Sequence, residues 1–212
     1  MSHLIFPLTV VSGVLAGLFG FMPDFISGHS LSQILLYALI IQVGLGIGMR
    51  PDLKNIIKHF NPKLLLLPVC TIAGTLAFTY VATLIFRNDS SSDLMAIGSG
   101  FGYYTLSSVL ISQFKEASAG ADAAASIAAI ALLTNVVREM FALLSCRFLS
   151  SRGHGVEAIS VAGINSMDVC LPMIIGKSGE EENSDTQLVS AAIFHGIAIE
   201  ISVPILISLF CG

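Results

Sequence analysis

The sequence predicts an all-α membrane protein, a bundle of spanning helices in which glycines break one helix and a proline breaks another. Of its 212 residues, 54% are hydrophobic and only 11% are charged, and the mean hydropathy is +0.85. Soluble domains carry about a quarter charged residues, and they could not cover so much apolar surface. The composition therefore indicates lipid as the solvent of this chain.

Apolar runs long enough to cross a bilayer recur along the chain. A spanning helix needs about 20 apolar residues. We expect one transmembrane domain over 1–212, with spans at about 4–22, 31–49, 64–86, 94–112, 121–149, 156–175 and 188–211. The first run has no basic segment before it, which favours a spanning helix over a cleaved signal peptide.

Loop charges predict how these spans are oriented. Two basic stretches, 50–63 and 147–152, should be cytoplasmic by the positive-inside rule. The polar loop 87–93 and the acidic loop 177–185 suit the outer side. With the N-terminus inside, both basic stretches are cytoplasmic only if 94–112 enters and returns on one side. The charges therefore favour a re-entrant segment there over a full crossing.

The segment 94–112 is apolar but contains glycines at alternate positions. Each glycine weakens a helix by about 1 kcal/mol and frees the backbone to bend. Non-helical backbone at membrane depth is tolerated only where it faces protein or a wet cavity. We expect a site-lining hairpin, with close helix packing through small residues as the alternative. The site-lining backbone and hydroxyls would be those of Gly98, Gly100, Gly102, Tyr103, Tyr104 and Ser107.

The segment 156–175 is interrupted at Pro172, shortly after Asn165, Ser166 and Asp168. Proline removes a backbone donor and clashes with the preceding turn. Helices broken near the midplane, with polar groups at the break, form the binding sites of many secondary transporters. A kinked helix whose Asn and Ser satisfy the freed backbone is the alternative, but it leaves Asp168 unexplained.

Several ionisable side chains lie well inside the predicted spans. A charge at the bilayer centre costs at least about 2.5 to 3.5 kcal/mol on insertion scales, so such residues face the bundle interior or water. They are candidates for binding a substrate or a proton. The residues concerned are Arg138, Glu139, Asp168, His195 and Glu200.

Glu139 and Asp168 are the carboxylates that we expect to bind a cationic solute or an exchanged proton. Desolvation and mutual repulsion would help each to take up a proton, so that a proton and an ammonium group compete for the same oxygens. Asn135 precedes Glu139 by four residues and shares its helix face. Substrate or proton binding is therefore assigned to Glu139, Asp168, Asn165, Ser166, Asn135 and His195.

The remaining polar residues at membrane depth have alternative roles. Arg138 either neutralises a carboxylate on another helix or snorkels to the inner interface. His195 either relays protons or is packed and hydrogen-bonded inside the bundle. Glu200 either completes the carboxylate site or pairs across a subunit interface.

Composition argues against several kinds of site. Four cysteines, Cys70, Cys146, Cys170 and Cys211, show no CxxC spacing and no paired histidine, so we expect buried free thiols and neither a metal nor a cofactor. The net charge of −4 argues against a nucleic-acid partner.

Polar motifs follow one another in a recognisable order. They are Gly100-Phe101-Gly102-Tyr103-Tyr104-Thr105-Leu106-Ser107, Arg138-Glu139, Asn165-Ser166-Met167-Asp168 with Leu171-Pro172, and His195-Gly196 with Val203-Pro204-Ile205. From about residue 31 to the C-terminus, their order and spacing resemble the lysine exporter LysO family of bacterial inner-membrane proteins. The resemblance implies export of L-lysine and related toxic analogues against protons, with the paired intramembrane acidic residues of the family at Glu139 and Asp168.

Members of that family are longer and have helices before the matched region, so this chain resembles their C-terminal two-thirds. The resemblance therefore implies partners in the bilayer, either a companion small membrane subunit or a second copy of this chain in a homodimer.

Taken together, these features predict a secondary transporter, not an enzyme, that exports L-lysine and related cationic amino acids by proton antiport. A cation channel with the glycine-rich hairpin as its filter, or a transporter of another solute, is the nearest alternative. An intramembrane protease fits poorly, because the aspartyl type needs two aspartates and the serine type needs Gly-x-Ser-Gly, whereas position 97 is Ile. A membrane scaffold would not need charges at membrane depth.

Overall fold

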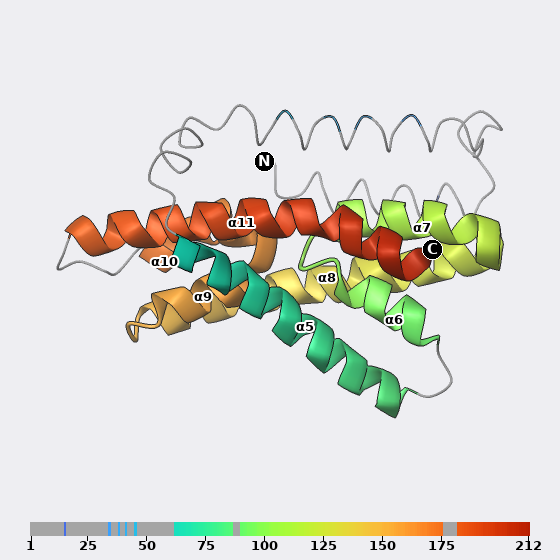
Figure 1. Cartoon of the computed structure of the whole chain (residues 1–212), viewed down its shortest axis with the longest axis horizontal. Helices are drawn as coiled ribbons and strands as arrows, with labels where there is room; N and C mark the ends of the chain where they lie inside the picture. Colours follow the sequence, from blue (N-terminus) through green and yellow to red (C-terminus); the bar gives the residue numbers. More distant parts are fainter. Residues whose placement is uncertain are drawn as a thin grey trace. The chain divides into compact units, whose positions relative to one another are not determined.

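A computed structural model describes residues 62–86, 90–175 and 182–212, together with five single positions before residue 46. The chain divides into two compact units, Met1–Leu45 and Gly46–Gly212. The continuous helices described below belong to the second unit (Figure 1). Apart from those five positions, the predicted spans 4–22 and 31–49 lie outside the described residues.

Every regular element in the described ranges is helical. Leu66–Ile85, Ala121–Ser150 and Gln187–Cys211 are long and apolar enough to cross a membrane, which confirms the predicted all-α membrane bundle. The elements are η1 (Pro62–Leu65), α5 (Leu66–Ile85), α6 (Ser91–Gly98), α7 (Tyr104–Ala119), α8 (Ala121–Ser150), α9 (Gly155–Ala162), η2 (Gly163–Met167), α10 (Leu171–Ile175) and α11 (Glu182–Cys211).

Two helices run the full length of this unit. α8 and α11 each contain 30 residues, so each is about 45 Å long, compared with about 30 Å for a hydrocarbon core. Alanine, the strongest helix former, is abundant in the first half of α8. Both helices can therefore cross a bilayer and extend beyond it.

The glycine-rich segment forms a first hairpin, Ser91–Ala119, in which α6 and α7 are joined by a non-helical turn (Figure 1). The chain reverses direction at this turn. Near the open end, Lys115 of α7 pairs with Asp93 of α6 at 2.8 Å, and its Nζ also donates to Ser92 Oγ at 3.3 Å. The predicted break in this segment is confirmed, and both arms of the hairpin lead to the same end of the unit.

The interrupted segment forms a second hairpin, Gly155–Ile175, built from α9, η2 and α10. The Ser150 hydroxyl, at the end of α8, donates to the carbonyl of Ile174, at the end of α10. α10 therefore returns to the end at which α9 starts. The predicted interruption is present, but it begins at Gly163 (φ 60°). Pro172 stands in the first turn of α10, where a missing N–H is tolerated.

The tips of the two hairpins meet. The Ile164 N–H donates to the Phe101 carbonyl at 3.4 Å, and a Cβ added to Gly163 would lie 2.6 Å from that oxygen. Phe101 is fully buried and has a φ of 48°, unusual for a residue with a side chain. The close approach requires glycine at 163.

The hairpins open toward opposite ends of the unit. At the end of the first hairpin, the Ser92 hydroxyl donates to the Phe210 carbonyl of α11. At the end of the second, Leu67 of α5 packs on the cluster that contains Cys146 and Ile174. Arg147 and the start of α5 therefore lie at one end, together with the open end of the second hairpin.

This arrangement contradicts one expectation from the loop charges. The loop 177–185 was placed on the opposite side from 147–152. Ile175, which precedes that loop, belongs to a helix of five residues, about 7.5 Å long, whose end is bonded to Ser150. A helix so short does not recross the unit, so the loop is entered from the side of Ser150.

The cysteines are free, as expected, but not all are buried. Cys146, Cys170 and Cys211 are buried, whereas Cys70 is exposed on α5. The expectation of burial is wrong for Cys70, because its side of α5 is left uncovered by the described helices.

We predict that Gly163→Ala destabilises the protein by about 2 kcal/mol or more, because a Cβ would meet the Phe101 carbonyl and because residues with side chains rarely adopt a positive φ. Gly153→Ala is the matched control, since Gly153 also has a positive φ (82°) but nothing within 4 Å. Thermal unfolding in detergent measures both variants. Equal losses would show that the hairpin contact contributes nothing.

Candidate functional site

The turn of the first hairpin is held by Asn135 from the middle of α8. The Gly102 N–H donates to Asn135 Oδ1 at 2.9 Å, and Asn135 Nδ2 donates to the carbonyls of Ala131 at 2.9 Å and Ile97 at 3.2 Å. A Cβ on Gly100 would lie 2.4 Å from Nδ2. These contacts occupy the amide and make Asn135 a support of the turn.

Arg138 lies one helical turn further along α8 and reaches the same turn. Its guanidinium carbon is 5.1 Å from the centroid of the Phe101 ring, within cation–π range. Its Nη2 donates to Thr75 Oγ1 of α5 at 3.3 Å. Arg138, which the sequence suggested as the charge partner of a carboxylate, thus contacts an aromatic face and a hydroxyl.

The second break is held by His195 from the middle of α11. Ser166 Oγ donates to the Ala192 carbonyl at 2.9 Å and lies 3.3 Å from His195 Nδ1. His195 Nε2 is 3.1 Å from Thr71 Oγ1, which is 2.7 Å from Ser160 Oγ. His195 is fully buried, and a continuous chain of polar contacts links the second break to α5 and α9.

Asn165 and Asp168 flank Ser166 but differ in environment. Asn165 is 8% exposed, and among the described residues its Nδ2 has no acceptor. That nitrogen would lie 3.5 Å from a Cβ on Gly102, so it faces the turn of the first hairpin. Asp168 is exposed in the turn that follows η2, where its Oδ1 accepts from the Val169 N–H at 2.5 Å.

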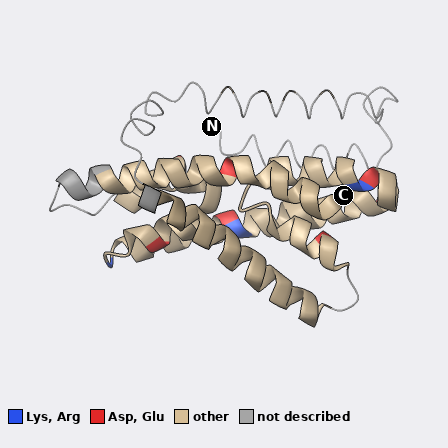
Figure 2. Ribbon diagram, viewed as in Figure 1, with Lys and Arg blue, Asp and Glu red and all other residues tan. Residues whose placement is uncertain are grey.

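Carboxylates from three elements lie within electrostatic range of one another or of the tyrosines that follow the first hairpin tip. The charges of Glu139 and Asp168 interact with each other. The Tyr103 hydroxyl interacts with the charges of Glu200 and Asp168, and that of Tyr104 with Glu139. Glu200 is buried on α11. Figure 2 shows that charged residues are sparse in the middle of the described helices.

The remaining predicted residues occupy different places. Ser107 is buried on α7 and lies 3.5 Å from Asn135 Nδ2, so it belongs to the support of the turn. Gly98 is away from the tip, on the side of α6 that faces α5. A Cβ there would lie 2.4 Å from Thr79 Oγ1, so Gly98 allows α5 and α6 to approach closely.

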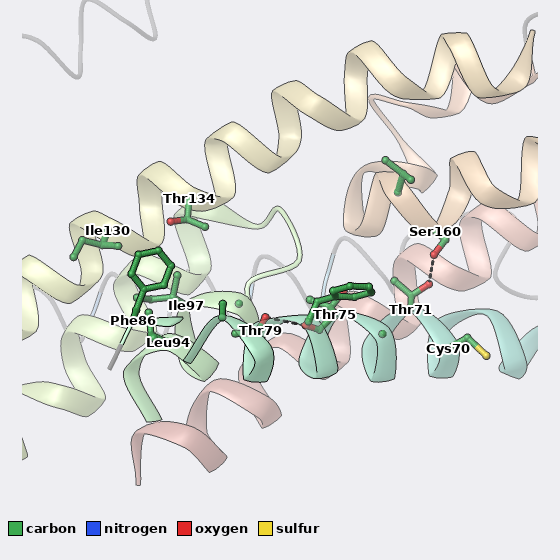
Figure 3. A pocket seen from close by; sticks show the side chains of 15 residues that line it. Cys70, Thr71, Thr75, Thr79, Phe86, Leu94, Ile97, Ile130, Thr134 and Ser160 are labelled. Carbon is green, nitrogen blue, oxygen red and sulfur yellow. Dashed lines mark hydrogen bonds between the residues drawn. The ribbon is translucent and has the colours of Figure 1, made fainter. Parts of the chain in front are cut away.

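A cavity of about 700 Å³ opens between α5, α6, α8 and α9 (Figure 3). We call it the threonine groove, because its polar lining consists of hydroxyls: Thr71, Thr75, Thr79, Thr134 and Ser160. The rest of its lining is largely apolar. Sequence reasoning missed this groove, although threonines four residues apart on α5 are a signal for a polar helix face.

The threonine groove contacts both breaks through its walls. Thr75 lines it and accepts from Arg138, which lies over Phe101 in the first hairpin. Thr71 lines it and contacts His195, which holds the second hairpin through Ser166. A solute in this groove would therefore be one side chain away from each hairpin tip.

Comparisons with known proteins give one consistent result. The family model of the lysine exporter LysO matches residues 8–211. The chain is 28% identical over 206 residues to "Lysine exporter LysO" of Escherichia coli (strain K12), an alignment that covers 95% of this chain and 61% of that protein. The chain thus spans about three-fifths of the length of this relative. No solved structure matches it significantly.

The helical architecture agrees with this match. Three described helices have the length and composition of membrane spans, and the family match covers nearly the whole chain. These findings identify a multi-pass protein of the bacterial inner membrane. The chain belongs to the lysine exporter LysO family.

Proposed function

We propose that this chain exports L-lysine and related cationic amino acids from the bacterial cytoplasm as a secondary transporter, in exchange for protons. The observation that carries this proposal is the meeting of two oppositely directed hairpins beside Glu139 and Asp168. Broken helices that meet near the midplane are the usual construction of secondary-transporter sites.

The carboxylates supply the chemistry of exchange. An ammonium group binds the ionised form of Glu139 or Asp168, and a proton occupies the same oxygens when the cation leaves. Because the two charges interact, a bound cation or proton at one site relieves repulsion at the other. Substrate and proton then alternate on the same pair of carboxylates.

The opposed hairpins suit alternating access. Each has its open end at a different end of the unit, and the described residues of the two tips share one backbone hydrogen bond, of 3.4 Å. Movement of one hairpin while the other stays in place would open the carboxylates to one side at a time. The long helices α8 and α11 would serve as the fixed frame.

The assembly is also a proposal. The chain spans 61% of the length of its Escherichia coli relative, so a companion small membrane subunit or a second copy of this chain could supply further helices around the site. In such an assembly, the Gly46–Gly212 unit would contribute the two hairpins.

The direct test reconstitutes the purified chain, alone and with any co-encoded small membrane protein, in liposomes loaded with radiolabelled lysine. We expect lysine efflux to accelerate when the outside is acidified, to saturate with lysine, and to lose its pH dependence with a protonophore. Saturable exchange separates a transporter from a channel. No proton-coupled lysine movement in either preparation would contradict the proposal.

We predict that Glu139→Gln and Asp168→Asn each lower lysine exchange by at least about 30-fold, because a removed carboxylate that pairs with a bound cation costs about 2 kcal/mol or more. Proton movement coupled to lysine should fall in parallel. Glu157→Gln is the control, since Glu157 is an exposed carboxylate that pairs with His154 away from the hairpin tips.

Lysine-coupled proton flux that persists at the wild-type rate in both carboxylate variants would contradict their role, whatever the effect of the control.

A further inference from the structure

Arg138 is a half-buried cation with few partners. Its side chain contacts the Thr75 hydroxyl and the face of the Phe101 ring, and within the described ranges no carboxylate forms an ion pair with it. A guanidinium carries five N–H donors in a planar fork that matches a carboxylate. Removing such a cation from water without an anion is costly. Its environment therefore favours an anionic ligand.

Asn165 provides a second donor at the same turn. Its side chain is 8% exposed, its Nδ2 has no acceptor among the described residues, and that nitrogen faces Gly102, the neighbour of Phe101. A buried amide nitrogen without an acceptor costs about 1 to 3 kcal/mol. Two groups with donors to spare, the guanidinium of Arg138 and the amide of Asn165, thus approach consecutive residues of one turn from different helical segments.

The opposite charge lies around the next residues of this turn. The hydroxyl of Tyr103 interacts with the charges of Asp168 and Glu200, and that of Tyr104 with Glu139. The donors therefore contact or face Phe101 and Gly102, and the charges of the carboxylates act on the two tyrosines that follow. This separation of charge is complementary to a molecule with one carboxylate and two ammonium groups.

We propose that Arg138, assisted by Asn165, binds the α-carboxylate of the transported amino acid. This inference rests on the proposed function and narrows its substrate class to amino acids with a free carboxylate. The guanidinium donates hydrogen bonds to the carboxylate at the edge of the threonine groove, while Glu139, Asp168 and Glu200 accept from the ammonium groups. Diamines of the same length lack the group that Arg138 recognises.

The test compares lysine with 1,5-diaminopentane, which is lysine without its carboxylate. Binding of each to the purified full chain in lipid nanodiscs is measured by calorimetry. We expect the wild type to bind lysine at least about tenfold more tightly, since hydrogen bonds between charged groups favour the carboxylate. The ratio of the two affinities is the readout, because a general loss of structure would affect both ligands.

In Arg138→Met the ratio should fall close to one, with diaminopentane bound as well as before or better, since a repelling cation is gone. Arg138→Lys should keep part of the preference, because it retains the charge but loses the fork. Asn165→Leu should lower the ratio by a smaller factor. The matched control is Arg152→Met, which removes another arginine that lies over a phenylalanine, Phe148, at 4.0 Å; Arg152 is exposed, and the ratio should not change.

Three results would overturn this inference. Equal wild-type affinities for lysine and diaminopentane would do so and leave cation transport intact. An Arg138→Met variant that weakens both ligands by the same factor would show that Arg138 only holds the turn. If the wild type binds neither ligand, the proposed function fails and this inference fails with it. Should Arg138→Met not fold, the wild-type ratio and Arg138→Lys still decide.

Discussion

At the centre of the bundle the carbonyl of Phe101 approaches Gly163 so closely that a single added carbon would lie 2.6 Å away. This contact sets the position of everything else at the site. It joins two helix breaks that are about 60 residues apart in the chain. If both segments were continuous helices, the polar groups at the two breaks would not meet. The strained φ of Phe101 and the glycine φ at 163 are therefore features of a junction that is held from both sides.

The two sides are built alike. In each, a broken hairpin is followed by a helix of 30 residues, and a polar side chain from the middle of that helix holds the break: Asn135 for the first hairpin and His195 for the second. Counted from Ala121 and Glu182, Glu139 and Glu200 both hold the nineteenth position of their helices. The hairpins open in opposite directions, as in transporters built from inverted repeats. Glu200 thus stands in α11 at the position that Glu139 holds in α8.

Much of this was predictable from the sequence, for physical reasons. Apolar runs of membrane length indicate a lipid environment, so the helical bundle could be predicted from composition. Glycines at alternate positions indicate a backbone that is free to bend, so the first break could be predicted from the pattern. The position of the second break could not. The sequence predicts the break at Pro172, whereas the structure begins it at Gly163. A glycine inside an apolar run does not indicate which backbone will pack against it. The return of α10 was missed for a similar reason, since five residues of helix look like the end of a span.

Contacts between distant residues were also beyond the sequence. Nothing in the spacing of Asn135 and Glu139 shows that the amide is occupied by Gly102 and Ile97, and nothing around His195 shows that Thr71 lies beside it. The threonine groove is formed by four helices. Only its α5 wall has a regular spacing, threonine at every fourth residue, that is visible in the sequence. Contacts between side chains of different helices depend on how the helices and the two hairpins pack. The local sequence pattern does not indicate this packing.

The opposed hairpins are the central claim, and sided labelling tests them most directly. Single cysteines would replace Ser90, Ser118, Ser151 and Ile175 in a chain without its native cysteines, and membrane vesicles of known orientation would be treated with an impermeant maleimide. The account predicts that positions 90 and 118 react from one face of the membrane and that 151 and 175 react from the other. Reaction of 90 and 118 from opposite faces would mean that the first hairpin crosses the bilayer, and would contradict the account.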